Sequence, residues 1–333
     1  MLNRCKTHAR EILGLCVIAI STSLSSPPLR GEQNHSVRFV MNRTIEASTV
    51  PLNSLAISGD GKKIVSGGKE LLIWDAETGR QLMNLKNRAS IRGIALSPNE
   101  KLIASCGFNG TAELWELNNG EPLSNLDHPG QGSVRNIAFF PDGKKVVSVG
   151  SKKIMIRNVA TENDPLELNP QGSSSSLAVS SDGKTIATGT GKYLKLWDSN
   201  EGIEVDALDA GAPVLSVAFS FDGSEVLVGG VRTLKVWNIE KKKEVVAAES
   251  QHVIFSVAWS ADGEYICSGG DDHAVTIRDA NTLESLTVLE GHSDNVLCLA
   301  ISSDGRRVVS GGRDGTIIVW DQIEDRGVTK SKP

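Results

Sequence analysis

The chain alternates short apolar runs with tight turns, and residues 289–321 show this pattern most clearly. They contain three apolar runs, separated by turns at Asp304-Gly305 and Asp314-Gly315, and the last run ends at Trp320-Asp321. An Asp-Gly pair between apolar runs predicts a tight hairpin, because glycine adopts the positive φ that such turns require. The segment is therefore predicted to be an antiparallel meander of three strands.

The same pattern recurs from residue 37 onward. Seven segments end near residues 75, 116, 158, 198, 238, 279 and 321, at the spacing expected for the four-stranded blades of a propeller. The first turn of each segment is Asp-Gly, except in the second segment, where it is Asn99-Glu100. An outer fourth strand follows each of the first six segments. The sequence therefore predicts an all-β, seven-bladed propeller of four-stranded antiparallel blades.

One face of each first strand is kept small. Residues two apart in a strand share a face. Each segment has alanine at one position and a compact residue two positions earlier, while larger apolar residues occupy the other face. The alanines are Ala56, Ala95, Ala138, Ala178, Ala218, Ala258 and Ala300. Such asymmetry suits blades that converge on an axis, where a narrowing wedge leaves room for bulk on one side only.

These repeats resemble the WD40 repeat family over residues 37–321. In that family a histidine, a strand Ser or Thr, a turn Asp and a Trp form a hydrogen-bonded set that braces a blade. The resemblance assigns this role to His292, Ser310, Asp314 and Trp320. The other repeats match the set less well. The second has Ser105, Asn109 and Trp115 without the histidine, the third and sixth have Arg157 and Arg278 in place of Trp, and His128 lies in a longer loop.

The last repeat lacks an outer strand of its own, because only a polar tail, residues 324–333, follows the predicted propeller domain of residues 32–323. Residues 37–47 are left over at the other end of the chain. The family resemblance implies that they complete the last blade and close the ring, which would remove an exposed strand edge.

Residues 1–31 have the three parts of a secretory signal peptide. A basic lead precedes the apolar run at residues 12–24, and small residues follow it. The run is shorter than the ~20 apolar residues that a membrane span requires. We expect cleavage within residues 23–31 and an extracytoplasmic mature protein, secreted or periplasmic, with no membrane span. A lipoprotein site at Cys16 and a retained N-terminal membrane anchor are the alternatives.

Net charge and cysteine content limit the classes of partner and of disulfide that we expect. The net charge of −5 gives no global electrostatic case for nucleic acid. Cys106, Cys267 and Cys298 lie in apolar strand patterns and are expected to be buried small hydrophobic residues. We expect a monomer.

The sequence gives little support for an enzyme active site. Asp271, Asp272 and His273 are consecutive turn residues, which rarely converge on one metal ion, so a solvated turn is the preferred interpretation. The motif beginning at Trp74 resembles the docking motif of quinone-dependent propeller dehydrogenases, yet it occurs once. We expect a protein that is not an enzyme and needs no cofactor. A channel-centred hydrolase or quinone-type oxidoreductase is the alternative.

A surface for binding remains. The turns between second and third strands, and the loops entering first strands, should share one rim, where the family usually recognises partners. Several carry basic residues, whereas Asp271, Asp272 and Asp314 should make the other side acidic. The candidate binding residues are Lys69, Arg92, Arg135, Lys152, Lys192, Arg232 and Arg313. The hypothesis is a protein–protein interaction scaffold that binds an acidic peptide or other anionic partner there. The alternative is that these turns are simply solvated.

Overall fold

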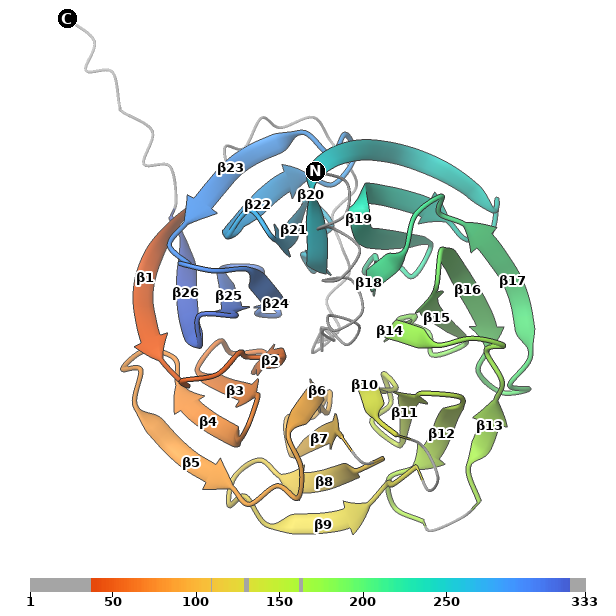
Figure 1. The fold of residues 1–333 in the computed structure, drawn as a ribbon, viewed down its shortest axis with the longest axis horizontal. Coiled ribbons are helices and arrows are strands. Elements are labelled where there is room, and N and C mark those ends of the chain that lie inside the picture. The colour runs from red at the N-terminus through yellow and green to blue at the C-terminus, as the bar shows by residue number, and fades with distance from the viewer. Residues whose placement is uncertain (1–36, 109, 129–131, 162–163, 324–333) are drawn as a thin grey trace, which may run out of the picture.

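The protein is a ring of β-sheets around a central axis (Figure 1). The computed structural model describes residues 37–108, 110–128, 132–161 and 164–323. Within these ranges the regular secondary structure consists of strands β1 to β26. The predicted signal peptide and polar tail lie outside the described residues.

Four sheets have four antiparallel strands each, in sequence order. They comprise β2 (Ser54–Ile57), β3 (Lys63–Gly67), β4 (Leu71–Asp75) and β5 (Gln81–Leu85); β6 (Ile91–Leu96), β7 (Leu102–Gly107), β8 (Ala112–Glu116) and β9 (Pro122–Asn125); β10 (Val134–Phe139), β11 (Lys145–Gly150), β12 (Ile154–Asn158) and β13 (Leu166–Leu168); and β14 (Ser174–Val179), β15 (Thr185–Thr190), β16 (Tyr193–Asp198) and β17 (Glu204–Asp209). The first strand of each sheet is nearest the central axis (Figure 1).

A fifth sheet has six strands in the order β18-β19-β20-β21-β22-β23. These are β18 (Val214–Phe219), β19 (Glu225–Asn238), β20 (Lys243–Trp259), β21 (Tyr265–Gly270), β22 (Ala274–Asp279) and β23 (Ser285–Glu290). The described residues thus form six hydrogen-bonded sheets, where the sequence predicts seven separate ones. The cause is β20, whose first part pairs with β19 and whose last part pairs with β21.

The turn predicted at residues 231–233 is also different in the structure. These residues lie inside β19, with a register shift between Val231 and Thr233. Arg232 takes up the irregularity with a φ of 58°, a left-handed conformation that a non-glycine residue adopts at a cost. The ladder to β20 therefore continues where the other repeats turn.

The last sheet closes the ring as predicted. Its order is β1-β26-β25-β24, formed by β24 (Val296–Ile301), β25 (Arg307–Gly312), β26 (Thr316–Ile323) and β1 (Arg38–Glu46). Strand β1 runs antiparallel to β26, from Arg38 opposite Ile323 to Glu46 opposite Thr316. The two ends of the described chain thus share one sheet.

Neighbouring sheets pack through the small face of one first strand against the large face of the next. Ala95 of β6 shares a buried cluster with Ile137 and Phe139 of β10, and Ala258 of β20 shares one with Leu299 of β24. The compact residues add hydrogen bonds between sheets. The Ser54 hydroxyl accepts one from the Ile94 backbone N–H at 3.0 Å, and equivalent bonds join Ser216 to Val257 and Ser256 to Leu299. The alanine pattern in the sequence therefore marks the contacts between sheets.

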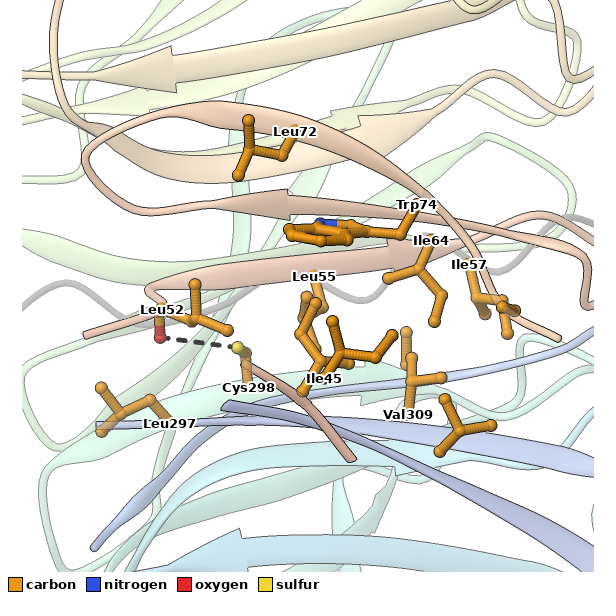
Figure 2. Packing of buried hydrophobic residues seen from close by; sticks show 14 of the residues in the cluster. Ile45, Leu52, Leu55, Ile57, Ile64, Leu72, Trp74, Leu297, Cys298 and Val309 are labelled. Carbon is orange, nitrogen blue, oxygen red and sulfur yellow. Dashed lines mark hydrogen bonds between the residues drawn. The ribbon is translucent and has the colours of Figure 1, made fainter. Parts of the chain in front are cut away.

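The seam between the last sheet and the first is packed in the same way. Cys298, Leu52 and Leu55 belong to one buried cluster, and the Cys298 thiol lies 3.6 Å from the Leu52 carbonyl oxygen (Figure 2). Gly311 permits this approach, because a Cβ there would lie 2.6 Å from the Cys298 sulfur and 2.9 Å from Leu55. Close packing at the seam thus depends on a glycine.

Ion pairs and hydrogen bonds of Arg307 also connect the last sheet with the first; we call this set of contacts the clasp. The Arg307 guanidinium donates to both carboxylate oxygens of Asp321, at 2.6 and 2.8 Å, to Glu77 at 2.9 Å and to the Gly61 carbonyl at 2.9 Å. Asn42 of β1 donates to the same Asp321 carboxylate. Hydrogen bonding to Asp321 raises the pKa of Arg307. One side chain therefore connects the last sheet with the first.

Candidate interaction face

One face of the ring carries the turns between second and third strands together with the loops that enter first strands; we call it the rim face. Backbone hydrogen bonds join the two kinds of segment. The N–H of Val214, where β18 begins, donates to the Gly191 carbonyl at 2.8 Å, and the N–H of Ile91 donates to the Gly68 carbonyl at 2.7 Å. The rim face is therefore a connected surface.

The residues expected to brace the last repeat form one hydrogen-bonded chain. His292 Nε2 lies 2.8 Å from the Ser310 hydroxyl, which also accepts from the Trp320 indole N–H at 2.9 Å. The other imidazole nitrogen lies 3.1 Å from an Asp314 carboxylate oxygen and 3.1 Å from the Thr316 hydroxyl. Burial lowers the pKa of His292, although Asp314 opposes the shift. Sequence reasoning missed the contribution of Thr316.

Other repeats keep part of this chain. The indole N–H donates to a hydroxyl in three of them, joining Trp74 to Ser66, Trp115 to Ser105 and Trp197 to Thr188. His128, whose alignment the sequence left unclear, lies 2.6 Å from the Ser148 hydroxyl and is 1% exposed. His128 is thus a bracing histidine that the sequence did not identify, because its loop is longer.

The buried His128 should make stability depend on pH. Burial, reinforced by the charge of Arg157, lowers the pKa of His128 to about 4. The unfolded chain, with a histidine pKa near ~6.5, then binds more protons than the folded one. Stability should be complete above pH ~6.5 and fall as the pH drops towards ~4, by up to about 3 kcal/mol from this residue. Urea unfolding at several pH values should show this loss, and H128N should reduce it.

The seven predicted binding residues all belong to rim-face segments, but they do not form one cluster. Lys69, Lys152 and Arg313 are exposed turn residues. Lys192 is ion-paired with Asp209 at 2.6 Å, and Arg232 donates to the Gln251 side chain at 3.1 Å. Arg92 and Arg135 differ from these five, because they lie half-buried in the innermost strands β6 and β10.

The innermost strands begin around the centre of the rim face, which we call the channel mouth, and several of them have one bulge residue there. The strand register shifts at Arg92, Arg135, Ser175, Leu215, Phe255 and Leu297. A bulge re-aims the side chain of its extra residue. Leu215, Phe255 and Leu297 are at most 9% exposed and share one cluster with Leu52, although they come from successive innermost strands. One side of the mouth is therefore apolar, and the β6–β10 side is cationic.

The rim face also carries acidic residues. Asp271 and Asp272 lie in the turn between β21 and β22, Glu290 ends β23, and Asp294 lies in the segment that leads into β24. The strands β21 and β22 lie across the ring from β6 and β10 (Figure 1), whereas Asp127 lies in the loop that leads into β10. His273 occupies a left-handed position with a φ of 64°. The described residues contain no cluster of three or more His, Cys, Asp or Glu arranged to hold a metal ion.

The opposite face has a hollow at the other end of the channel. Its lining is largely apolar, with Phe139, Val179 and Phe219 from the ends of innermost strands and Pro98, Pro141 and Phe221 from the following turns. Ala178 also lines it and is partly exposed, so a larger side chain at this position would find some free space. The two ends of the channel thus differ in chemistry.

Fold and repeats together define the class: an all-β propeller of antiparallel blades, closed by its N-terminal strand. The family description "WD domain, G-beta repeat" matches residues 79–116, 168–198, 243–279 and 283–321. The chain belongs to the WD40 repeat family, whose propellers are generally non-enzymatic and typically act as protein interaction scaffolds. Among the described residues, no helix is long and apolar enough to cross a membrane.

Individual relatives match about a third of the chain. Eukaryotic translation initiation factor 3 subunit I of Aspergillus fumigatus is 28% identical over 106 residues, 31% of this chain and 31% of its own length. WD repeat, SAM and U-box domain-containing protein 1 of Danio rerio is 29% identical over 32% of this chain and 23% of its own length. Cilia- and flagella-associated protein 52 of Chlamydomonas reinhardtii is 25% identical over 34% of this chain and 20% of its own length. The matched segments therefore span less than a third of each relative.

Proposed function

We propose that this protein is a non-catalytic interaction scaffold that binds a protein or peptide partner on the rim face, around the channel mouth. The observation that carries the proposal is the half-buried arginines Arg92 and Arg135 at the mouth, together with the exposed basic residues in the neighbouring turns. Arginine is enriched at binding surfaces. The name of the first relative, a subunit of an initiation factor, supports a role in assembly.

The cationic side favours an acidic peptide or another anionic partner. Arg92, Arg135 and Lys152 lie on two neighbouring sheets. Grouped charges of one sign orient a charged partner during encounter. Because charges on exposed groups are screened beyond about 8 Å at physiological salt, binding should weaken as salt rises.

Two further parts of the account are proposals. We count the six-stranded sheet as two blades, since the two ends of β20 pair with different neighbours, which gives seven blades in all. We also propose that the mature protein acts as an extracytoplasmic monomer after loss of residues 1–31, on the basis of the basic lead and short apolar run. Intact mass of the purified protein tests the second proposal, because a chain that still begins at Met1 would contradict it.

The binding proposal is tested by charge reversal on each face. K152E with R232E should abolish capture of proteins that wild type retains from the native compartment, as quantified by mass spectrometry. K62E with K184E is the matched control, because it reverses two exposed lysines in turns on the opposite face. Capture of the same proteins by both double variants would exclude the rim face as the binding surface.

A further inference from the structure

The closing strand β1 packs against a different neighbour on each side of a bulge. The register to β26 shifts after Met41, which lies opposite Trp320, so that Asn42 is the extra residue. Before the bulge, Phe39 packs in the cluster of the six-stranded sheet, whereas Ile45 beyond it packs in the cluster of the first sheet. Met41 shares a face with Phe39, because residues two apart in a strand do so. Its side chain is therefore directed towards the six-stranded sheet.

The methyl group of Met41 fills a notch at Gly291. This glycine follows β23 and precedes the bracing residue His292. A Cβ built on Gly291 would lie 2.5 Å from the Met41 methyl carbon, 3.0 Å from Ile318 Cδ1 and 3.2 Å from the Trp320 ring. The methyl group thus occupies the space that a side chain at residue 291 would need, beside two apolar side chains of β26. It connects the closing strand with the segment that carries the brace.

The rest of the Met41 side chain faces solvent. Met41 is 45% exposed, and the Thr44 hydroxyl donates to its sulfur at 3.6 Å in an exposed contact. Two other methionines lie within the described ranges. Met83 is half-buried, and Met155 is 3% exposed. A dissolved oxidant should therefore reach the thioether of Met41 before the other two.

The thiols of the described residues are protected from the same oxidant. Cys106, Cys267 and Cys298 are free and buried. Burial raises the pKa of Cys106 and of Cys267, so these groups stay protonated. Oxidation proceeds from the thiolate and requires access. Within this part of the chain, Met41 is thus the sulfur best placed to react.

We propose that Met41 is a site of reversible oxidation that controls how firmly β1 closes the ring. The oxidant is a peroxide. The sulfur lone pair attacks one oxygen of hydrogen peroxide, the O–O bond breaks as the S–O bond forms, and the proton of the transferred hydroxyl passes to the leaving hydroxide to give water. The sulfur is oxidised to a sulfoxide, the peroxide is reduced, and methionine sulfoxide reductases reverse the change. The inference goes beyond the proposed function, because it concerns ring closure rather than a partner.

Oxidation acts on the contact between β1 and the notch. The sulfoxide oxygen is bonded to the atom next to the methyl group, so a methyl group left in place would hold this oxygen close to Ile318 and Trp320. Polar groups without a hydrogen-bond partner are disfavoured in such apolar surroundings. The Thr44 hydroxyl offers a donor on the exposed side. The oxidised side chain therefore leaves the notch, and β1 keeps its ladder to β26 but loses its contact with Gly291.

Limited treatment with hydrogen peroxide tests the site and its consequence together. Peptide mass spectrometry should show Met41 oxidised about tenfold faster than Met155. In the oxidised protein, amides of β1 should exchange about fivefold or more faster, while those of β24 and β25 stay protected. Reduction by a methionine sulfoxide reductase should restore slow exchange. M41Q places a polar side chain at the notch and should speed exchange of β1 without any oxidant.

Two variants control for effects elsewhere in the chain. M41L keeps an apolar side chain of similar volume without the sulfur, so peroxide should leave its β1 exchange unchanged. M83L is the matched control, because it removes another partly exposed methionine, and it should respond to peroxide as wild type does. The proposal is overturned if Met83 or Met155 oxidises before Met41, if oxidation of Met41 or M41Q leaves β1 exchange unchanged, or if M41L responds as wild type does.

Discussion

A protein lacking residues 32–46 is expected to aggregate or to become sensitive to proteases, and to lose its cooperative thermal transition. The deletion removes β1, so the outer edge of β26 would be left unpaired, and an unpaired edge is a template for association with other chains. It also removes Phe39 and Ile45, which are 6% and 5% exposed. Loss of one such side chain costs about 2–5 kcal/mol, comparable with the whole stability of many domains.

Light scattering after size-exclusion chromatography and a thermal melt would measure these effects. Deletion of residues 324–333 is the matched control at the other end of the chain, and it should behave as wild type. An unchanged melting temperature and unchanged solubility in the protein without residues 32–46 would show that closure by β1 contributes little.

H292A is expected to destabilise the protein more than loss of any other histidine. The change removes the contacts to Ser310, Asp314 and Thr316, while the Ser310 hydroxyl keeps its contact to Trp320 and the Asp314 carboxylate keeps its contacts to Ser293 and Thr316. The lost hydrogen bonds and the cavity together should cost about 2–4 kcal/mol. Denaturant unfolding near pH 7 measures this as a lower midpoint with an unchanged slope.

Three other histidine variants provide the comparison for the loss of stability in H292A. H128A should have an intermediate effect, since one hydroxyl contact of His128 is lost. H252A should have little effect, because the His252 side chain is 51% exposed. H273A changes a residue in an exposed turn, and a loss of stability in H273A equal to that in H292A would argue against a special bracing role for the last repeat.

The last repeat concentrates stabilising interactions where the chain closes on itself. It has the full bracing chain, the clasp at Arg307 and the packing of Cys298 against the first sheet. We interpret this concentration as compensation for the seam, whose two sides come from opposite ends of the sequence. Early formation of this sheet is difficult, because β1 and β26 are far apart along the chain.

The regular part of the fold could be predicted because it follows local rules. The Asp-Gly turns, the alternation of apolar residues and the recurring alanine each report on one strand and its neighbour. Closure by β1 was also predictable, since one repeat lacked an outer strand and one strand was left over. These features could be predicted without knowing which side chains from distant parts of the sequence are in contact.

What the sequence could not show depends on contacts between repeats. The clasp at Arg307 joins residues as far apart as Gly61 and Asp321, and no local pattern marks it. Strand β19 runs through Arg232, whose left-handed backbone conformation is unusual for arginine. The candidate binding residues were found as a set, but their separation into exposed turn residues and the half-buried pair at the mouth required the structure.

Amide hydrogen exchange tests the central claim, a single ring closed by its N-terminal strand, most directly. The amides of β1 that pair with β26 should exchange as slowly as those of β25, through the same cooperative opening, because all belong to one sheet. Fast exchange across β1, while β24 and β25 remain protected, would show that the ring is not closed by this strand and would contradict the account.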